Sequence, residues 1–294
     1  MSSKNHGLLI GLLCYVMWGI LPAFWNLLVG VDPFLILCAR IVFAFIFMMC
    51  LIAVTGRMSV FLETLRDKKK VLYLIPCALL ITFNWGLYIW AVNTGQIVYA
   101  SLGYYMNPLI AFSFGVVFFR ERCTRLQLVA VGLALIGVLI SIIAYGRVPL
   151  ISIGLGFSFA VYGAIKKKAN ADPNSGIAIE SLLISPFALV FALVFMPDSV
   201  GAVNLSQLFL LIGGGVVTAV PLVLFSRAVN DIPLITVGFL QYIAPSLTLI
   251  YGLFIGLRPS ESQIVTIIFI GMGLIVFSIA LIRNAKAQSA VSAS

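Results

Sequence analysis

Ten long apolar stretches, separated by short connections, make up almost the whole chain. A helix needs about 20 apolar residues to cross the hydrocarbon core of a bilayer, and each stretch meets that length within a few residues. The chain is 62% hydrophobic and 9% charged, whereas a soluble domain carries about 25% charged residues. We therefore expect an all-α membrane protein with ten transmembrane helices. The stretches cover residues 7–29, 33–55, 71–92, 97–119, 126–146, 149–165, 177–196, 206–227, 233–256 and 262–282.

Lysine and arginine residues gather in the connections on one side of the membrane. If both termini are cytoplasmic, 15 of the 18 basic residues lie on that side, Arg147 and Arg258 lie outside, and Arg40 lies within a span. Such a bias sets the orientation of multi-pass proteins. We therefore expect cytoplasmic termini, and we interpret the net charge of +9 as a mark of topology rather than of binding to nucleic acid.

The longest cytoplasmic connection, residues 57–70, is amphipathic. Its apolar residues recur at helical spacing, at Met58, Phe61, Leu62 and Leu65, with basic residues elsewhere. This pattern predicts a short helix that lies on the inner leaflet and anchors the chain there. A partner-binding role is the alternative.

One stretch of sequence occurs twice. Residues 91–108 read AVNTGQIVYASLGYYMNP, and residues 228–245 read AVNDIPLITVGFLQYIAP, 137 positions later. Because five spans, an odd number, separate the copies, the second copy enters the membrane from the opposite side. The sequence therefore predicts two inverted five-helix repeats, residues 1–147 and 148–294, an arrangement typical of secondary transporters.

Further pairs of motifs recur in the same order. An Asp-Pro pair, followed by an ionisable residue, opens both the second and the seventh span. A capping box fits at the start of both the fifth and the tenth span. An aromatic residue followed by glycine lies in both the first and the sixth span. Each pair is weak alone, and together they support the duplication. The pairs are Asp32-Pro33 and Arg40 with Asp172-Pro173 and Glu180, Thr124-x-x-Gln127 with Ser260-x-x-Gln263, and Trp18-Gly19 with Tyr162-Gly163.

Two prolines, Pro108 and Pro245, occupy matched positions inside spans. A proline within a helix removes a backbone hydrogen bond, and in a bilayer the freed carbonyl needs a neighbouring helix or a wet cavity. We interpret both prolines as candidate helix hinges near a central cavity, with simple kinking as the alternative.

Polar residues within the spans concentrate in the third, fourth, eighth and ninth spans. Ser101, Tyr105 and Pro108 share one face of the fourth span, and Tyr242 and Pro245 lie on the corresponding face of the ninth. Such faces can line a pathway with aromatic rings and neutral hydrogen-bonding groups. For any single residue, polar contact between helices is an equal alternative; for the cluster, the pattern favours a pathway.

Two ionisable residues lie within spans. Arg40 is about seven residues into the second span, or ~10 Å deep at about 1.5 Å per residue. The hydropathy pattern places Glu180 only a few residues into the seventh span, near the cytoplasmic side. Charges at depth cost at least a few kcal/mol and usually face the protein interior. We weigh a functional role against structural pairing for Arg40, and proton coupling against snorkelling to the interface for Glu180.

The sequence argues against an enzyme. The only histidine is His6, so neither a zinc site of the HExxH type nor a Ser–His dyad can form, and no pair of intramembrane aspartates and no P-loop is present. The 5 cysteines have no metal-binding spacing. We expect no catalytic residue, no metal and no cofactor. A passive channel or a lipid scramblase is the alternative to a carrier.

Several motifs resemble those of the RarD family, in the EamA-type branch of the drug/metabolite transporter superfamily. The resemblance runs from about residue 7 to residue 283. The motifs are YVMWGILPAFW, NWGLYIWAVN, ASLGYYMNPL, FFRER, GLGFSFAVYGAIKKK, AVPL and VGFLQYIAP. One position departs from the EamA pattern, because Glu121 follows the fourth span whereas Arg258 follows the ninth. This departure puts the symmetry of the two loop contacts in doubt.

The resemblance implies a transporter of the bacterial inner membrane with ten helices, a central cavity and cytoplasmic termini. Proteins of this kind carry the name "chloramphenicol-sensitive protein", which links them to drug handling without fixing a substrate. Related transporters are thought to export amino acids and other small metabolites, with the third, fourth, eighth and ninth helices near the cavity. The similarity makes the following residues candidates for the lining: Trp18, Asn84, Trp85, Tyr88, Tyr105, Tyr162, Gln241 and Tyr242.

The working hypothesis is a carrier that moves a small organic solute by alternating access, with the two repeats rocking about a midplane site. The aromatic and neutral polar lining favours a neutral or zwitterionic, partly aromatic solute. The expected partners are that solute and the lipid bilayer, and a homodimer stays open.

Overall fold

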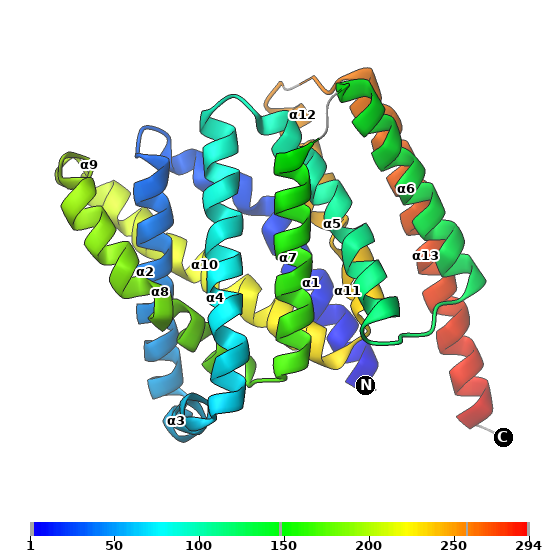
Figure 1. Cartoon of the computed structure of the whole chain (residues 1–294), viewed down its shortest axis with the longest axis horizontal. Helices are drawn as coiled ribbons and strands as arrows, with labels where there is room; N and C mark the ends of the chain where they lie inside the picture. Colours follow the sequence, from blue (N-terminus) through cyan, green and yellow to red (C-terminus); the bar gives the residue numbers. More distant parts are fainter. Residues whose placement is uncertain (1–2, 147–148, 257, 293–294) are drawn as a thin grey trace.

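The computed structural model describes residues 3–146, 149–256 and 258–292, and these residues form helices joined by short turns (Figure 1). Nine helical spans in this described part are long and apolar enough to cross a membrane, and α5, with its tyrosines and asparagine, is a tenth helix of similar length. The long helices are α1 (Ser3–Trp25), α2 (Pro33–Val54), α4 (Lys68–Asn93), α5 (Ile97–Val117), α6 (Arg125–Tyr145), α7 (Leu150–Ala169), α8 (Pro173–Phe195), α10 (Leu205–Asp231), the pair α11 (Leu234–Leu240) and α12 (Ile243–Phe254), and α13 (Glu261–Ser292). The short ones are η1 (Asn26–Leu28), α3 (Met58–Arg66) and α9 (Pro197–Gly201).

The long helices run alternately up and down, so the second five oppose the first five (Figure 1). The helix α1 begins and α13 ends at the end of the molecule where α3 lies, which we call the basic end. The helices α4 and α10, which correspond in the repeat, finish at opposite ends. The predicted all-α fold of ten spans in two inverted repeats is confirmed, while the boundary at residues 147 and 148, with Arg147, lies outside the described residues.

The packing exchanges one helix between the repeats. In the first repeat α4 and α5 pack on α7, which belongs to the second repeat, and in the second repeat α10 and α12 pack on α1, which belongs to the first. We call α4, α5 and α7 the first bundle, and α1, α10, α11 and α12 the second bundle. The helices α2 and α8 pack on each other and on both bundles, while α6 and α13 pair at the edge (Figure 1).

Capping residues decide where two of the helices begin. The Asp32 carboxylate accepts hydrogen bonds from the N–H groups of Phe34 and Leu35, and the Asp172 carboxylate accepts one from Ser175 N–H. In both helices proline is the first residue, where its missing N–H costs nothing. The helix α8 therefore begins at Pro173, four positions before the start at 177 that hydropathy predicted, because a cap rather than an apolar run sets its end.

The predicted capping boxes are also present. Thr124 and Gln127 exchange side-chain-to-backbone hydrogen bonds at the start of α6, and Ser260 and Gln263 do the same before α13. The end of α7 differs from the expectation: the helix runs to Ala169 rather than 165, and its last turn contains three lysines.

The predicted amphipathic helix is α3. Phe61 is 5% exposed and packs into the core, whereas Met58, Leu62 and Leu65 are 36–39% exposed. One apolar residue thus attaches α3 to the helices behind it, and three face away from the protein, as expected for a helix at the membrane interface.

The matched prolines have different effects on their helices. The helix α5 continues through Pro108, whereas the ninth span is interrupted at Gln241 and Tyr242, just before Pro245. Pro245 has no N–H to offer the carbonyl of Gln241, which instead accepts a hydrogen bond from Ala244 N–H. The helices α5 and α11 approach closely next to this break, since a Cβ on Gly238 would lie 3.1 Å from the carbonyl oxygen of Pro108.

Candidate functional site

A small cavity lies near the middle of the described helices, between α2, α4, α8 and α10. Its volume is about 20 Å³, which is on the scale of individual water molecules. The walls come from both bundles and from the two helices that join them. The lining includes Ile81, Thr82 and Trp85 from α4, Thr218 from α10, and Glu180 and Ser181 from α8.

Arg40 of α2 lies at one side of this cavity. Its guanidinium carbon is 3.9 Å from the centre of the Trp85 ring and 5.0 Å from that of Trp25. Its Nε donates a hydrogen bond to Thr218 Oγ1 at 3.1 Å. Among the described residues, no carboxylate forms an ion pair with Arg40. Two indole rings and one hydroxyl group thus hold a cation at membrane depth.

Glu180 of α8 also lines the cavity, and it is 4% exposed. Lys166 Nζ, from the last turn of α7, lies 2.6 Å from Glu180 Oε1, and Tyr162 Oη donates to Glu180 Oε2 at 3.2 Å. Lys166 is 3% exposed. The expectation that Glu180 lies only a few residues into its span is wrong, because α8 begins at Pro173. Glu180 follows Pro173 by the same number of residues as Arg40 follows Pro33.

Arg40 and Glu180 do not form an ion pair with each other; the ionic partner of Glu180 is Lys166. The sequence predicts that Lys166 is a cytoplasmic loop charge, because a run of three lysines usually marks a solvated helix end. Only the tertiary structure shows that Lys166 faces inward, and nothing in the pattern separates it from its neighbours.

Several lining candidates lie in the packed core beside the cavity. Trp18 and Tyr162 belong to a cluster of rings with Phe159 and Phe225, and Tyr162 stacks on Phe225 with centroids 5.7 Å apart. Asn84 is 3% exposed. It donates to Leu155 O and to Ser158 Oγ, both at 2.8 Å, and so joins α4 to α7.

The repeated tyrosines meet each other. Tyr242 is fully buried, and its hydroxyl donates to the backbone oxygen of Tyr105 at 3.2 Å. Gln241, 7% exposed, lies at the break between α11 and α12. Tyr88 packs edge-to-face on Tyr104, with centroids 5.6 Å apart, and Ser101 is partly buried on α5.

Of the residues expected at the site, Trp85 and Glu180 line the cavity, and Arg40 contacts its wall. The tyrosines of the repeat lie where α5 meets α11 instead. The sequence offered no signal for Thr218, which is one of many hydroxyl residues in the spans. Whether the remaining candidates line a pathway in another state of the protein stays a prediction.

A second set of polar contacts joins the two bundles at the basic end. Glu121 follows α5 and accepts hydrogen bonds from Leu234 N–H at 2.7 Å and Ile235 N–H at 2.9 Å, the first residues of α11. Lys167 Nζ lies 3.6 Å from Glu121 and donates to the backbone oxygens of Val229 and Ile232. A carboxylate thus sits at a helix N-terminus and an ammonium at a helix C-terminus, where each stabilises the helix dipole. We call this set the clamp.

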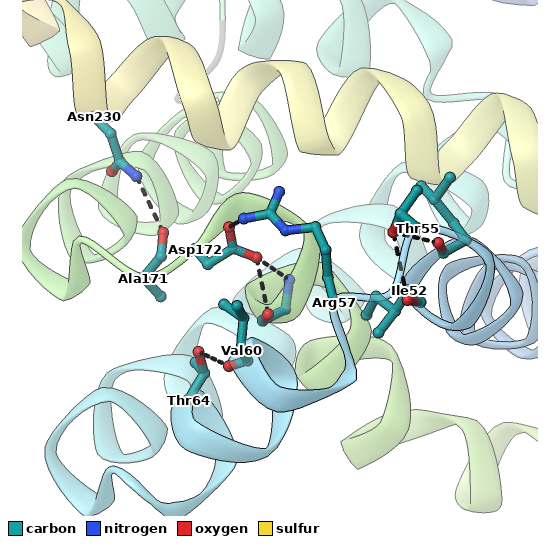
Figure 2. Close-up of polar contacts among 10 residues, drawn as sticks. Ile52, Thr55, Arg57, Val60, Thr64, Ala171, Asp172 and Asn230 are labelled. Carbon is teal, nitrogen blue, oxygen red and sulfur yellow. Dashed lines mark hydrogen bonds and ion pairs between the residues drawn. The ribbon is translucent and has the colours of Figure 1, made fainter.

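Two further contacts lie near the clamp (Figure 2). Arg57 Nη2, before α3, lies 2.8 Å from Asp172 Oδ1, and Asn230 Nδ2 donates to Ala171 O at 3.2 Å. Asp172 therefore caps α8 and binds the α2–α3 connection at once. The contact of Arg57 with Asp172 thus ties the first repeat to the second at the basic end, whereas the bond from Asn230 to Ala171 joins α10 to the α7–α8 connection within the second repeat.

The described residues contain no group of three His, Cys, Asp or Glu side chains that could hold a metal ion. The arrangement instead offers a charged and aromatic cavity between two helix bundles, and polar contacts that close one end of the interface.

Comparison with known proteins shows that the chain is similar to one transporter family. The model of the EamA-like transporter family matches residues 5–143 and again residues 147–279, so one family unit occurs twice. The chain is 38% identical to "Uncharacterized transporter YojE" of Bacillus subtilis over 292 residues, with 98% of both chains covered. It is 37% identical to "Protein RarD" of Escherichia coli over 280 residues, with 94% of this chain and 95% of the other covered.

A protein of known crystal structure aligns with a TM-score of 0.74 at 18% identity, covering 94% of this chain and 99% of the other. At this identity, the likeness concerns the fold alone.

Proposed function

The chain belongs to the EamA-like transporter family, as its motifs predicted, and we propose that it is a secondary transporter that moves a small organic solute across the bacterial inner membrane by alternating access. The solute is a metabolite or a drug, and chloramphenicol is a candidate because of the name that RarD-like proteins carry. The basic end faces the cytoplasm in this proposal, because lysine and arginine favour that side.

The observation that carries the proposal is a cavity between two bundles that are clamped at one end. The first bundle contributes Trp85 to the cavity and Glu121 and Lys167 to the clamp. The second contributes Thr218 to the cavity and the junction of α10 and α11 to the clamp. Releasing the clamp and separating the rings of Tyr162 and Phe225, which stack between the bundles, would therefore open a path from the cavity to the basic end without unfolding either bundle.

The moving bodies in this proposal are the bundles rather than the repeats. The helices α7 and α1 each pack on two helices of the other repeat, so rocking the repeats as units would tear these helices from their neighbours. Rocking the bundles instead keeps both sets of contacts. The contact between Tyr242 and Tyr105, where α11 crosses α5, then acts as the pivot.

A non-enzymatic permease agrees with the relatives, which are named transporters. The family membership says less about mechanism, so a carrier must be separated from a passive channel or a lipid scramblase. Saturation and counterflow make this separation, because only a carrier binds and releases one solute per cycle.

Accessibility of introduced cysteines tests alternating access. In a cysteine-free background, we place one cysteine at Ala111, a buried residue that faces Gly238 on the clamp side, and another at Ile184 in the cavity wall. Removing the clamp with Glu121→Gln is expected to raise labelling at position 111 from the basic side and to lower labelling at position 184 from the opposite side. Labelling that rises at both positions, or at neither, contradicts alternating access.

Counterflow in proteoliposomes tests transport itself. Vesicles loaded with an unlabelled solute are diluted into the labelled one, with chloramphenicol and small metabolites as the screened solutes. Transient accumulation that saturates supports the carrier. Flux that is linear in concentration and lacks counterflow supports a channel, and loss of lipid asymmetry without solute flux supports a scramblase.

A further inference from the structure

Arg40 is a cation in the membrane interior, and none of the residues that the structure describes forms an ion pair with it. A charged side chain at this depth usually pairs with an opposite charge or marks a ligand path. Its Nε is used by Thr218, and its ring faces are used by Trp85 and Trp25. Its two terminal amino groups form no hydrogen bond or ion pair with any residue that the structure describes, and the side chain is only partly buried.

The other charges at the cavity do not balance Arg40. Glu180 is bound by Lys166 on one oxygen and by Tyr162 on the other, so this carboxylate and this ammonium neutralise each other. The cavity wall in the described residues otherwise offers hydroxyl groups and apolar side chains. One positive charge is therefore left over, and a low-dielectric site with one unmatched cation favours an anion.

We infer that the terminal amino groups of Arg40 bind the carboxylate of a monoanionic organic solute whose apolar part lies between Trp85 and Thr218 once the bundles have rocked apart. In this structure the cavity of about 20 Å³ has room for no more than a water molecule, so the solute enters only when the cavity widens. A guanidinium binds a carboxylate by two parallel hydrogen bonds, and such bonds are shorter and stronger than those between neutral groups. The indole ring of Trp85 lies against the guanidinium of Arg40, and Thr218 accepts a hydrogen bond from its Nε, so both residues orient the two terminal amino groups. This inference rests on the proposed transport function and names its substrate class.

The same geometry argues against a zwitterion. An ammonium group in the cavity needs a free carboxylate, and Glu180 already has two partners. An amino acid would have to displace Lys166, which would leave a second buried cation without a partner. The site thus prefers an acid to the corresponding amino acid, which revises the expectation of a neutral or zwitterionic solute.

A set of three molecules with one carbon skeleton tests the inference. The acid is 3-phenylpropanoate, the neutral analogue is 3-phenylpropanamide, and the zwitterion is phenylalanine. Acetate, benzoate and indole-3-acetate, each with its amide, extend the set to smaller and larger solutes. Binding to the full-length protein in detergent is followed by the shift in thermal unfolding and by the fluorescence of Trp25 and Trp85, which adjoin the guanidinium.

At least one acid is expected to bind wild type more tightly than its amide, and more tightly than the amino acid, by about ten-fold or more, because a charge-assisted fork is lost. Arg40→Gln should abolish this preference, and Arg40→Lys, which keeps the charge but not the fork, should reduce it. Arg66→Gln, the same change at an exposed arginine of α3, should leave it intact.

Three outcomes overturn the inference. The first is that no acid in the set distinguishes wild type from Arg40→Gln when Arg40→Lys is folded. The second is tighter binding of phenylalanine than of 3-phenylpropanoate. The third is stabilisation that depends on Arg40 but comes from added phosphatidylglycerol instead of a carboxylate, which would make Arg40 a contact for lipid phosphate.

The transport proposal can fail separately. Acid binding that depends on Arg40, together with absence of counterflow, would remove the transporter mechanism and leave the anion site. Counterflow of a solute that lacks a carboxylate would keep the transporter and remove the anion site.

Discussion

The two ends of the molecule differ in how the bundles are held together. At the basic end, Glu121 binds the start of α11 and Lys167 binds the end of α10. At the opposite end, the equivalent of Glu121 is Arg258, which is exposed. Near that end the Asn26 side chain donates a hydrogen bond to Tyr251 Oη at 2.8 Å, but this bond joins η1 to α12 within the second bundle and does not link the two bundles. A sequence duplicated in opposite orientations has therefore become asymmetric in its closing contacts.

The asymmetry extends to the cavity. Arg40 and Glu180 occupy matching positions of the two repeats and have opposite charges, and only Glu180 has an ionic partner. The charge of Glu180 is thus neutralised within the protein, whereas the charge of Arg40 is neutralised by a bound solute in our proposal. The inverted repeat provides the frame, and substitutions that break its symmetry distinguish one side of the membrane from the other.

The largest expected effect comes from the buried ion pair. Lys166→Met leaves the Glu180 carboxylate buried with the Tyr162 hydroxyl but without its ionic partner, which should lower the free energy of unfolding by about 3–5 kcal/mol. The double variant Lys166→Met/Glu180→Met removes both charges and should recover most of that loss. Arg40→Met removes a charge with no ionic partner and should cost less than Lys166→Met. Unfolding in detergent measures all three, and equal losses for Lys166→Met and Arg40→Met would contradict the difference between the two sides.

The clamp should have the next largest effect. Glu121→Ala removes the acceptor for two N–H groups of α11 and should cost about 1–2 kcal/mol, as loss of a helix cap does. Glu261→Ala, at an exposed acid in the first turn of α13, is the matched control and should change stability little. Cysteine labelling from the basic side should rise in Glu121→Ala alone. If the Glu261 variant shows the same rise, the clamp does not close the basic end.

The pivot should depend on one hydrogen bond. Tyr242→Phe removes the bond to the oxygen of Tyr105 within the core and should cost about 0.5–1.5 kcal/mol. Tyr251→Phe removes the partner of Asn26 at the exposed end, where water replaces it, and should cost less. Thermal unfolding compares the pair. Greater damage from Tyr251→Phe would mean that the bond between the bundles contributes less to stability than this exposed bond within the second bundle.

The smallest effect is expected for the exposed ion pair in Figure 2. Arg57 is 44% exposed, so Arg57→Gln should change the free energy of unfolding by less than about 1 kcal/mol. Asp172→Ala should cost more, because Asp172 also caps α8. Equal effects of these two substitutions would mean that the cap adds nothing to the ion pair.

The sequence predicted the features that follow from local chemistry. Apolar length located the spans, the repeat gave the inversion, and the capping residues Thr124 and Ser260 marked helix starts. Hydropathy placed the start of α8 too late, since Pro173 and Ser175 are not apolar although Asp172 makes them helical. Local pattern alone thus predicts the number and the order of the membrane spans, but not the short helices η1 and α9 or the break between α11 and α12.

Features that depend on which helix faces which were not predictable in the same way. The inward turn of Lys166, the contact of Arg40 with Thr218, and the exchange of α1 and α7 between the repeats involve residues far apart in the chain. A single sequence shows which residue types are present but not which residues contact each other. The repeat that contains Tyr105 and Tyr242 is evident in the sequence, whereas the hydrogen bond between these two residues is seen only in the structure.

The exchange of α1 and α7 has a consequence for how such a chain can arise. In this fold the first helix of each repeat packs on the third and fourth long helices of the other repeat. A single repeat on its own would therefore leave its first helix without a packing partner, and the surface of its third and fourth helices uncovered. Two copies inserted in opposite directions each provide the packing surface for the first helix of the other, as two proteins do when they swap an identical element. An ancestral half-length protein would therefore have needed both orientations in the same membrane. Fusion into one chain makes the antiparallel pair obligatory.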